Sequence, residues 1–214
     1  MKKKFILKIF YLIITIFIFA APLMAENKSA SPFAPLLSGR MGVSMVSFAQ
    51  VASSSEGTAT ESVAAAPESG SISTTIASIQ YEIFQNNTRS FFFNGVGSIS
   101  TTSLDKYYAI GLGMNWYLNG AAALATFLDS GMKIQIVPKI RYYAGIDVLG
   151  RYLAYTTSTE TRGDVGFEIG GHLGAIYGID DIRGIKAEAG VFQGVGIETS
   201  STNIQIMLGG TYFL

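Results

Sequence analysis

Large apolar residues alternate strictly with small or polar ones along the stretch YYAIGLGMNWYL, from Tyr107 to Leu118. The even-numbered positions carry the large apolar side chains, namely Tyr108, Ile110, Leu112, Met114, Trp116 and Leu118. Successive side chains of a β-strand point to opposite faces, so a period of two predicts a strand with one apolar face. The opposite face of this strand is small or polar.

The same alternation recurs in segments 38–51, 74–85, 90–100, 138–155, 165–179, 185–197 and 203–214. We therefore predict eight antiparallel strands, or ten if the segment 121–128 is also extended. The parity of apolar residues never changes between 132 and 155, which favours one long strand beginning near Pro138; a three-residue turn near Ala144 is the alternative. Polar turn-forming clusters separate the strands.

Two connections are longer than these turns. Residues 53–71 are polar and of low complexity, which predicts a mobile loop. Residues 119–131 begin with Asn119, contain helix formers and end with Gly131, a pattern that also fits a short amphipathic helix.

Charged residues fall almost entirely on the face opposite the apolar one. We expect them to line the lumen of a barrel, with polar groups inside and apolar groups facing lipid. The expected lumen network comprises Arg40, Glu82, Lys139, Arg141, Asp147, Arg151, Glu168, His172, Lys186 and Glu188.

Aromatic residues on the apolar face gather near the strand ends. One predicted girdle, at the end of the barrel where the chain enters, comprises Tyr81, Phe91, Trp116, Tyr142, Tyr177 and Tyr212. The other comprises Tyr108, Tyr152 and Phe167. The ten residues between Tyr142 and Tyr152 span roughly 25 Å in a tilted strand, which matches the apolar band of a transmembrane barrel.

The first 25 residues predict a cleaved secretory signal peptide. Four lysines within the first eight residues and the apolar run IFYLIITIFIFAAPLM precede a small residue, Ala25. An uncleaved anchor helix is the alternative, although about 16 apolar residues fall short of the roughly 20 that a span needs. Without these residues the chain holds 11 basic and 15 acidic residues, a net charge of −4 that argues against a nucleic-acid ligand.

With these features and the terminal strand NIQIMLGGTYFL, residues 38–214 resemble small bacterial outer-membrane β-barrels of the OmpA type and their porin-like relatives. The resemblance implies residues 26–37 as a periplasmic tail, 53–71 as an extracellular loop, and the outer membrane of a Gram-negative bacterium as location. It further implies contact with outer-membrane lipid and lipopolysaccharide, and recognition of the last strand by the barrel-assembly machinery. The chain departs from the family's usual terminal phenylalanine by ending in Leu214.

Eight strands enclose an interior that side chains can fill. Nearly balanced lumen charges favour a monomeric barrel with a plugged lumen and a structural or surface-exposed role. A narrow porin-like channel for small solutes is the alternative. A lipid-modifying enzyme is a third possibility, because related barrels use a histidine and a serine, but His172 is the single histidine and no His-x-Ser motif follows it. We therefore expect no catalytic residue, cofactor or metal.

Overall fold

The computed structural model describes residues 35–50, 69–99, 104–121, 123–126, 133–136, 138–156, 160–180 and 183–214. The predicted signal peptide, the tail up to residue 34 and residues 53–68 of the predicted loop lie outside the described residues. Residues 36 and 37, predicted as tail, and 69–71, predicted as loop, belong to strands instead.

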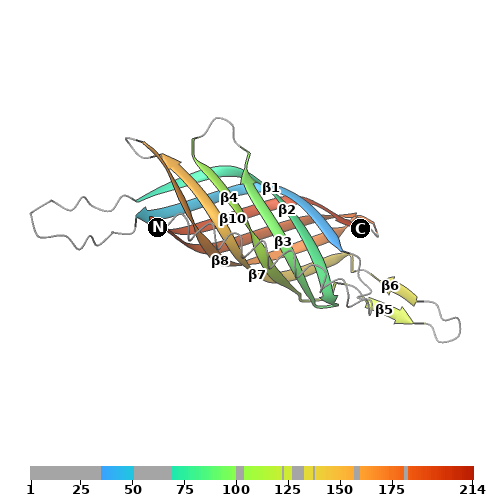
Figure 1. The fold of residues 1–214 in the computed structure, drawn as a ribbon. Coiled ribbons are helices and arrows are strands. Elements are labelled where there is room, and N and C mark those ends of the chain that lie inside the picture. The colour runs from blue at the N-terminus through green and yellow to red at the C-terminus, as the bar shows by residue number, and fades with distance from the viewer. Residues whose placement is uncertain are drawn as a thin grey trace, which may run out of the picture. The chain divides into compact units, whose positions relative to one another are not determined.

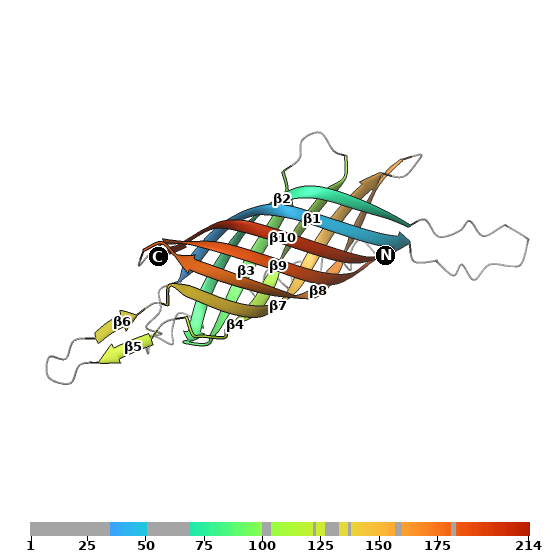
Figure 2. The same ribbon diagram turned by 180° about the vertical axis from the view of Figure 1, so that it is seen from behind.

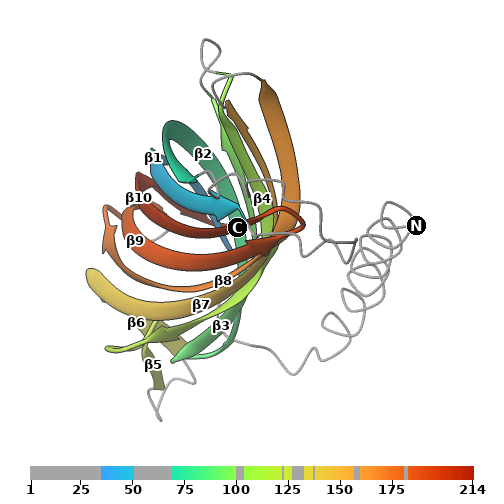
Figure 3. The ribbon, with the colours of Figure 1, turned by 90° about the vertical axis from the view of Figure 1, so that its left-hand side faces the viewer.

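Eight strands form a closed barrel (Figures 1 and 2). They are β1 (Leu36–Gln50), β2 (Ser69–Asn86), β3 (Arg89–Ser98), β4 (Lys106–Tyr117), β7 (Ile140–Thr156), β8 (Thr161–Gly178), β9 (Arg183–Gly196) and β10 (Thr199–Phe213). Each strand pairs antiparallel with its neighbours in the chain, with β4 beside β7, and β1 pairs with β10 to close the ring. The predicted eight-stranded up-and-down barrel is therefore confirmed, and Figure 3 shows the strands curving around its interior.

The remaining two strands, β5 (Ala123–Thr126) and β6 (Lys133–Ile136), form a two-stranded sheet of their own. The extended alternative for segment 121–128 is thus correct for residues 123–126, whereas the helical alternative is wrong there. Neither strand enlarges the barrel. The strand predicted to begin near Pro138 begins at Ile140 and continues through Ala144 without a split.

The outer face of the barrel is apolar across its middle. Outward side chains remain strongly exposed, for example Ile79 at 67%, Ile169 at 62% and Leu208 at 60%. A soluble protein rarely exposes so large a continuous apolar surface, whereas this is the face that a transmembrane barrel presents to lipid. The alternating sequence forms this barrel because most outward positions are apolar and closure leaves no unpaired strand edge.

The two ends of the barrel are named here by the chain. The terminal end carries Leu36 and Leu214, where the Leu214 N–H donates to the Pro35 carbonyl at 2.9 Å; the opposite end is the loop end. Eight of the nine predicted girdle aromatics are more than a third exposed on the outer face, and Trp116 is half-buried. Tyr81 and Tyr212 both pair with Leu37 at the terminal end, while Tyr108 pairs with Tyr152 toward the loop end.

Among the described residues, no helix has the length and apolar character needed to cross a membrane.

Candidate functional site

The barrel interior holds the charged side chains that could take part in binding or catalysis. Nine of the ten predicted network residues are at least 93% buried there: Arg40, Glu82, Arg141, Asp147, Arg151, Glu168, His172, Lys186 and Glu188. The tenth, Lys139, lies outside this network. It precedes β7 and is exposed, with its ammonium 5.3 Å from the centre of the Tyr177 ring. Parity placed Lys139 inside, but at a strand end its long aliphatic stem lets the charge reach the rim.

The central ion pair joins Arg40 on β1 to Glu188 on β9. Arg40 Nη1 lies 2.5 Å from Glu188 Oε1, Nη2 donates to Asn94 Oδ1 at 3.1 Å and Nε donates to Ser78 Oγ at 3.0 Å. Tyr143 donates to the second carboxylate oxygen of Glu188 at 2.7 Å. Arg40 therefore has three polar partners in the interior, as a buried charge requires.

Glu82 on β2 is the second carboxylate of this network. Its Oε1 accepts hydrogen bonds from Ser90, from Asn115 Nδ2 at 3.0 Å and from the Tyr117 hydroxyl at 2.6 Å. Lys186 Nζ lies 3.7 Å from Glu82 Oε2 and 3.8 Å from Glu188 Oε2. Lys186 thus links the two carboxylates across the lumen.

His172 on β8 lies between two oxygen atoms. Its Nδ1 is 2.5 Å from Asp147 Oδ2, and its Nε2 is 2.7 Å from Asn115 Oδ1. The Asn115 amide donates from Nδ2 to Glu82, so its oxygen faces the ring and accepts from Nε2. Both ring nitrogens of His172 are therefore engaged in polar contacts. This geometry leaves neither nitrogen free to activate a serine.

A second polar cluster lies nearer the loop end. Arg151 on β7 forms ion pairs with Asp164 at 3.3 Å and with Glu168 at 3.5 Å. Glu168 also accepts from the Tyr107 hydroxyl at 2.7 Å and from Asn203 at 3.3 Å.

The Asp164 carboxylate also holds the connection between β9 and β10. It accepts from the backbone N–H groups of Ile197 at 2.9 Å and Glu198 at 3.1 Å, and from the Thr199 hydroxyl at 2.5 Å. Asp164 thus fixes one connection while pairing with Arg151.

Among the members that sequence reasoning missed are three tyrosines and one aspartate, namely Tyr107, Tyr117, Tyr143 and Asp164; neutral partners such as Asn94 and Asn115 were missed as well. The three tyrosines occupy odd positions on the polar face of their strands, and this parity was the available signal. Asp164 lies in the polar cluster STETRGD, which has the composition of a turn, but β8 already begins at Thr161.

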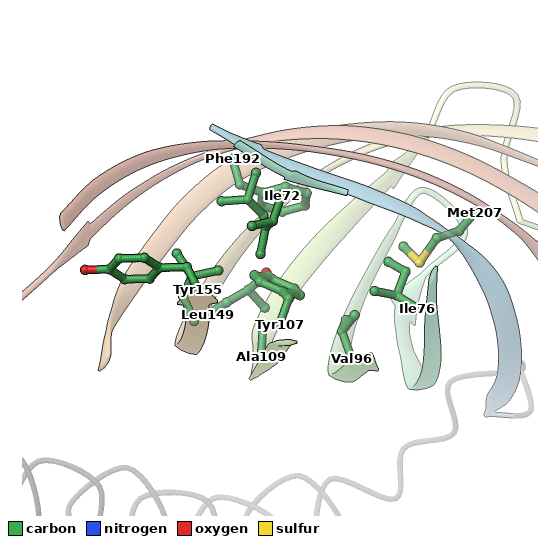
Figure 4. Packing of buried hydrophobic residues seen from close by; sticks show 11 residues of the cluster. Ile72, Ile76, Val96, Tyr107, Ala109, Leu149, Tyr155, Phe192 and Met207 are labelled. Carbon is green, nitrogen blue, oxygen red and sulfur yellow. The ribbon is translucent and has the colours of Figure 1, made fainter. Parts of the chain in front are cut away.

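Apolar side chains fill the interior around the second cluster. They are Val46, Ile72, Ile76, Val96, Tyr107, Ala109, Leu149, Leu153, Tyr155, Phe192 and Met207, all at most 7% exposed. Figure 4 shows Phe192 and Ile72 facing Tyr107 and Leu149 across the interior. A smaller group near the terminal end comprises Leu36, Phe84, Tyr117, Ala121, Tyr143 and Ile176. Buried charges and apolar side chains therefore lie together along the lumen.

The glycines of GFEIGGHLGAIYG (residues 166–178) make room for this filling. A Cβ on Gly170 would overlap the Phe192 ring, and one on Gly174 would overlap the Tyr143 ring. The four-residue glycine spacing is twice the strand period, so these glycines share the inner face.

Gly145 on β7 has the same role beside His172. A Cβ there would overlap His172 Nε2 and Asn115 Oδ1, the two atoms that share a hydrogen bond. We expect Gly145→Ala to lower the free energy of unfolding by about 1–3 kcal/mol, because overpacking displaces both groups. Urea unfolding in detergent micelles, followed by Trp116 fluorescence, measures this change.

Gly150→Ala on the same strand is the matched control. Its added methyl would point outward, 3.8 Å from the nearest atom, the Ile110 carbonyl oxygen. We expect no loss from this control, since alanine is not inferior to glycine in a strand. Equal stability of the two variants would contradict the assigned packing around His172.

Within the described residues, no group of three or more histidine, cysteine, aspartate or glutamate side chains has an arrangement suited to a metal ion. Most buried charges of the interior are paired, and Tyr107, Tyr117 and Tyr143 donate hydrogen bonds to carboxylates. These ion pairs and hydrogen bonds connect opposite parts of the barrel wall.

No protein-family model and no curated protein matches the chain. Among solved structures, the outer-membrane protease OmpT of Escherichia coli aligns over 88% of this chain and 99% of its own, with a TM-score of 0.52 and 9% identity. Neisserial surface protein A aligns over 82% and 97%, with a TM-score of 0.49 and 11% identity. The N-terminal barrel of Pseudomonas aeruginosa OprF aligns over 78% and 96%, with a TM-score of 0.41 and 8% identity. At 9% identity the likeness to OmpT concerns the fold alone. The chain has the fold of the bacterial outer-membrane β-barrels.

Proposed function

We propose that this protein resides in the bacterial outer membrane, has a structural or surface-exposed role and does not conduct ions. The observation that carries the proposal is the filled lumen. Side chains from seven of the eight barrel strands meet in the network around Arg40, Glu82, His172 and Glu188. Ion passage would require separating charges that are paired inside a water-poor interior.

The proposed orientation places the terminal end in the periplasm. In that orientation the β5–β6 hairpin follows a periplasmic strand end, and the connection between β1 and β2 is extracellular. The apolar band contacts outer-membrane lipid and lipopolysaccharide. β10 would present its outward residues Ile204, Ile206, Leu208 and Tyr212 to the assembly machinery before the barrel closes. The proposal includes no catalytic role, since both nitrogens of His172 are engaged.

Single-channel recording in planar bilayers tests the closed lumen. The wild-type protein is expected to insert without stable conductance. The double variant Arg40→Ser, Glu188→Ser removes both partners of the central pair, so it is expected to open a water-filled path and to conduct. This variant also verifies that the barrel inserts under the conditions used. Large, stable conductance of the wild-type protein would favour the narrow channel instead.

A further inference from the structure

Arg141, the second residue of β7, lies in the interior near the terminal end and is 1% exposed. Of the buried cationic side chains in the described part of the chain, it is the one without an ion pair. Its Nε and Nη1 atoms are buried and have no hydrogen-bond partner. A guanidinium carries five N–H donors and no acceptor, so these groups call for an acceptor.

Two hydroxyl groups without partners lie in the same region. Ser38 and Thr211 face each other across β1 and β10, and both side-chain oxygens are buried without a hydrogen bond. Thr211 Oγ1 lies 2.8 Å from the position that a Cβ on Gly184 would occupy, and Ile176 Cγ2 lies 3.2 Å from that position. Arg141 lies on β7, opposite β1 in the ring, but its Cζ is 4.8 Å from the ring of Phe213 on β10. Phe213 and Thr211 are two residues apart on the same face of β10, so the guanidinium extends toward the strand that carries Thr211.

The Phe213 ring covers the guanidinium, with its centre 4.8 Å from Arg141 Cζ. The ring offers a cation–π contact but no conventional acceptor for the N–H groups. Phe213 is only partly buried and is the penultimate residue of the chain. Rotation of this terminal side chain would expose Arg141 to the space beyond the terminal end.

The carboxylates of the interior are committed elsewhere. Glu82 and Glu188 pair with Lys186 and Arg40, Asp147 pairs with His172, and both Asp164 and Glu168 pair with Arg151. Arg141 forms an ion pair with none of these carboxylates, so its buried Nε and Nη1 groups leave room for a further acceptor.

We propose that Arg141, Ser38 and Thr211 form a binding site for a small oxyanion that enters from the terminal end when Phe213 moves aside. A phosphate group offers several acceptor oxygens to the guanidinium and the two hydroxyls at once. The site does not depend on a closed lumen, because it lies at the terminal end, away from the Arg40–Glu188 pair.

Inorganic phosphate is the probe for this site. Purified protein in an uncharged maltoside detergent is titrated with phosphate, against chloride at equal ionic strength, while phosphorus NMR linewidth and thermal unfolding midpoint are recorded. The wild type is expected to broaden the phosphate signal and to gain thermal stability. Arg141→Gln is expected to show neither effect. Lys139→Gln, which removes an exposed cation from the same end, is expected to behave as the wild type.

Ser38→Ala and Thr211→Val keep the guanidinium and test the site even if Arg141→Gln does not fold. Each is expected to weaken phosphate binding about tenfold or more, as the loss of one hydrogen bond to an anion predicts. The same titration in phosphatidylcholine vesicles, with and without phosphatidylglycerol, separates free phosphate from a lipid headgroup. Equal phosphate effects in the wild type and in all three variants, or no effect in the wild type, would overturn the proposal.

Discussion

Arg40→Met is expected to lower the free energy of unfolding by about 3–5 kcal/mol, because it leaves the buried carboxylate of Glu188 without its closest cation. Arg40 also donates to Asn94 and Ser78, so the variant removes three polar contacts from the interior. Lys186, at 3.8 Å from Glu188, compensates in part only, since it also serves Glu82. Urea unfolding in lipid vesicles, followed by the fluorescence of the single tryptophan, Trp116, measures the loss.

Lys139→Met is the matched control, since it removes a cation that lies exposed at the rim. We expect a change within about 0.5 kcal/mol, as is usual for exposed positions. The double variant Arg40→Met, Glu188→Leu is expected to recover much of the loss, because replacing both partners of a buried pair leaves no charge unpaired. A loss below about 1 kcal/mol for Arg40→Met would show that the pair does not stabilise the barrel.

The architecture could be predicted because alternation is a local property. Each residue of Tyr107–Leu118 reveals its face through its own parity, and the structure keeps that parity from Lys106 to Tyr117. The prediction from parity was wrong for Lys139, because this residue precedes the regular strand. There the flexible side chain, and not the pleat of the strand, determines where the charge lies. The parity rule was not applied to Asp164, because the polar residues around it have the composition of a turn.

The partners within the lumen could not be predicted by the same reasoning. Tyr107 reaches Glu168 and Tyr143 reaches Glu188 across 61 and 45 residues of chain. Such pairs depend on the tilt and stagger of the strands, which alternation does not encode. β5 was equally ambiguous, because its sequence ALAT fits a short helix as well as a strand.

Leu208→Arg is expected to lower the free energy of unfolding in lipid vesicles by about 2–4 kcal/mol, because it places a charge on the lipid face near mid-membrane. Leu208 on β10 is 60% exposed and lies between the outward residues Met41 and Ala187 of the neighbouring strands. It is four residues from Tyr212, or about 10 Å along the membrane normal in a tilted strand. At that depth the guanidinium reaches the headgroup region only by bending along the barrel wall.

Leu37→Arg separates membrane depth from the chemistry of the substitution. Leu37 also points outward, but it pairs with Tyr81 and Tyr212 at the level of the terminal-end girdle. There the charge reaches headgroups directly, so we expect a loss of no more than about 1 kcal/mol. Both variants are compared with the wild type in lipid vesicles by urea unfolding and Trp116 fluorescence. Because the two changes are chemically identical, a larger loss of unfolding free energy for Leu208→Arg reflects the greater depth of Leu208 in the membrane. Equal losses would contradict a lipid-facing outer surface whose centre lies near Leu208.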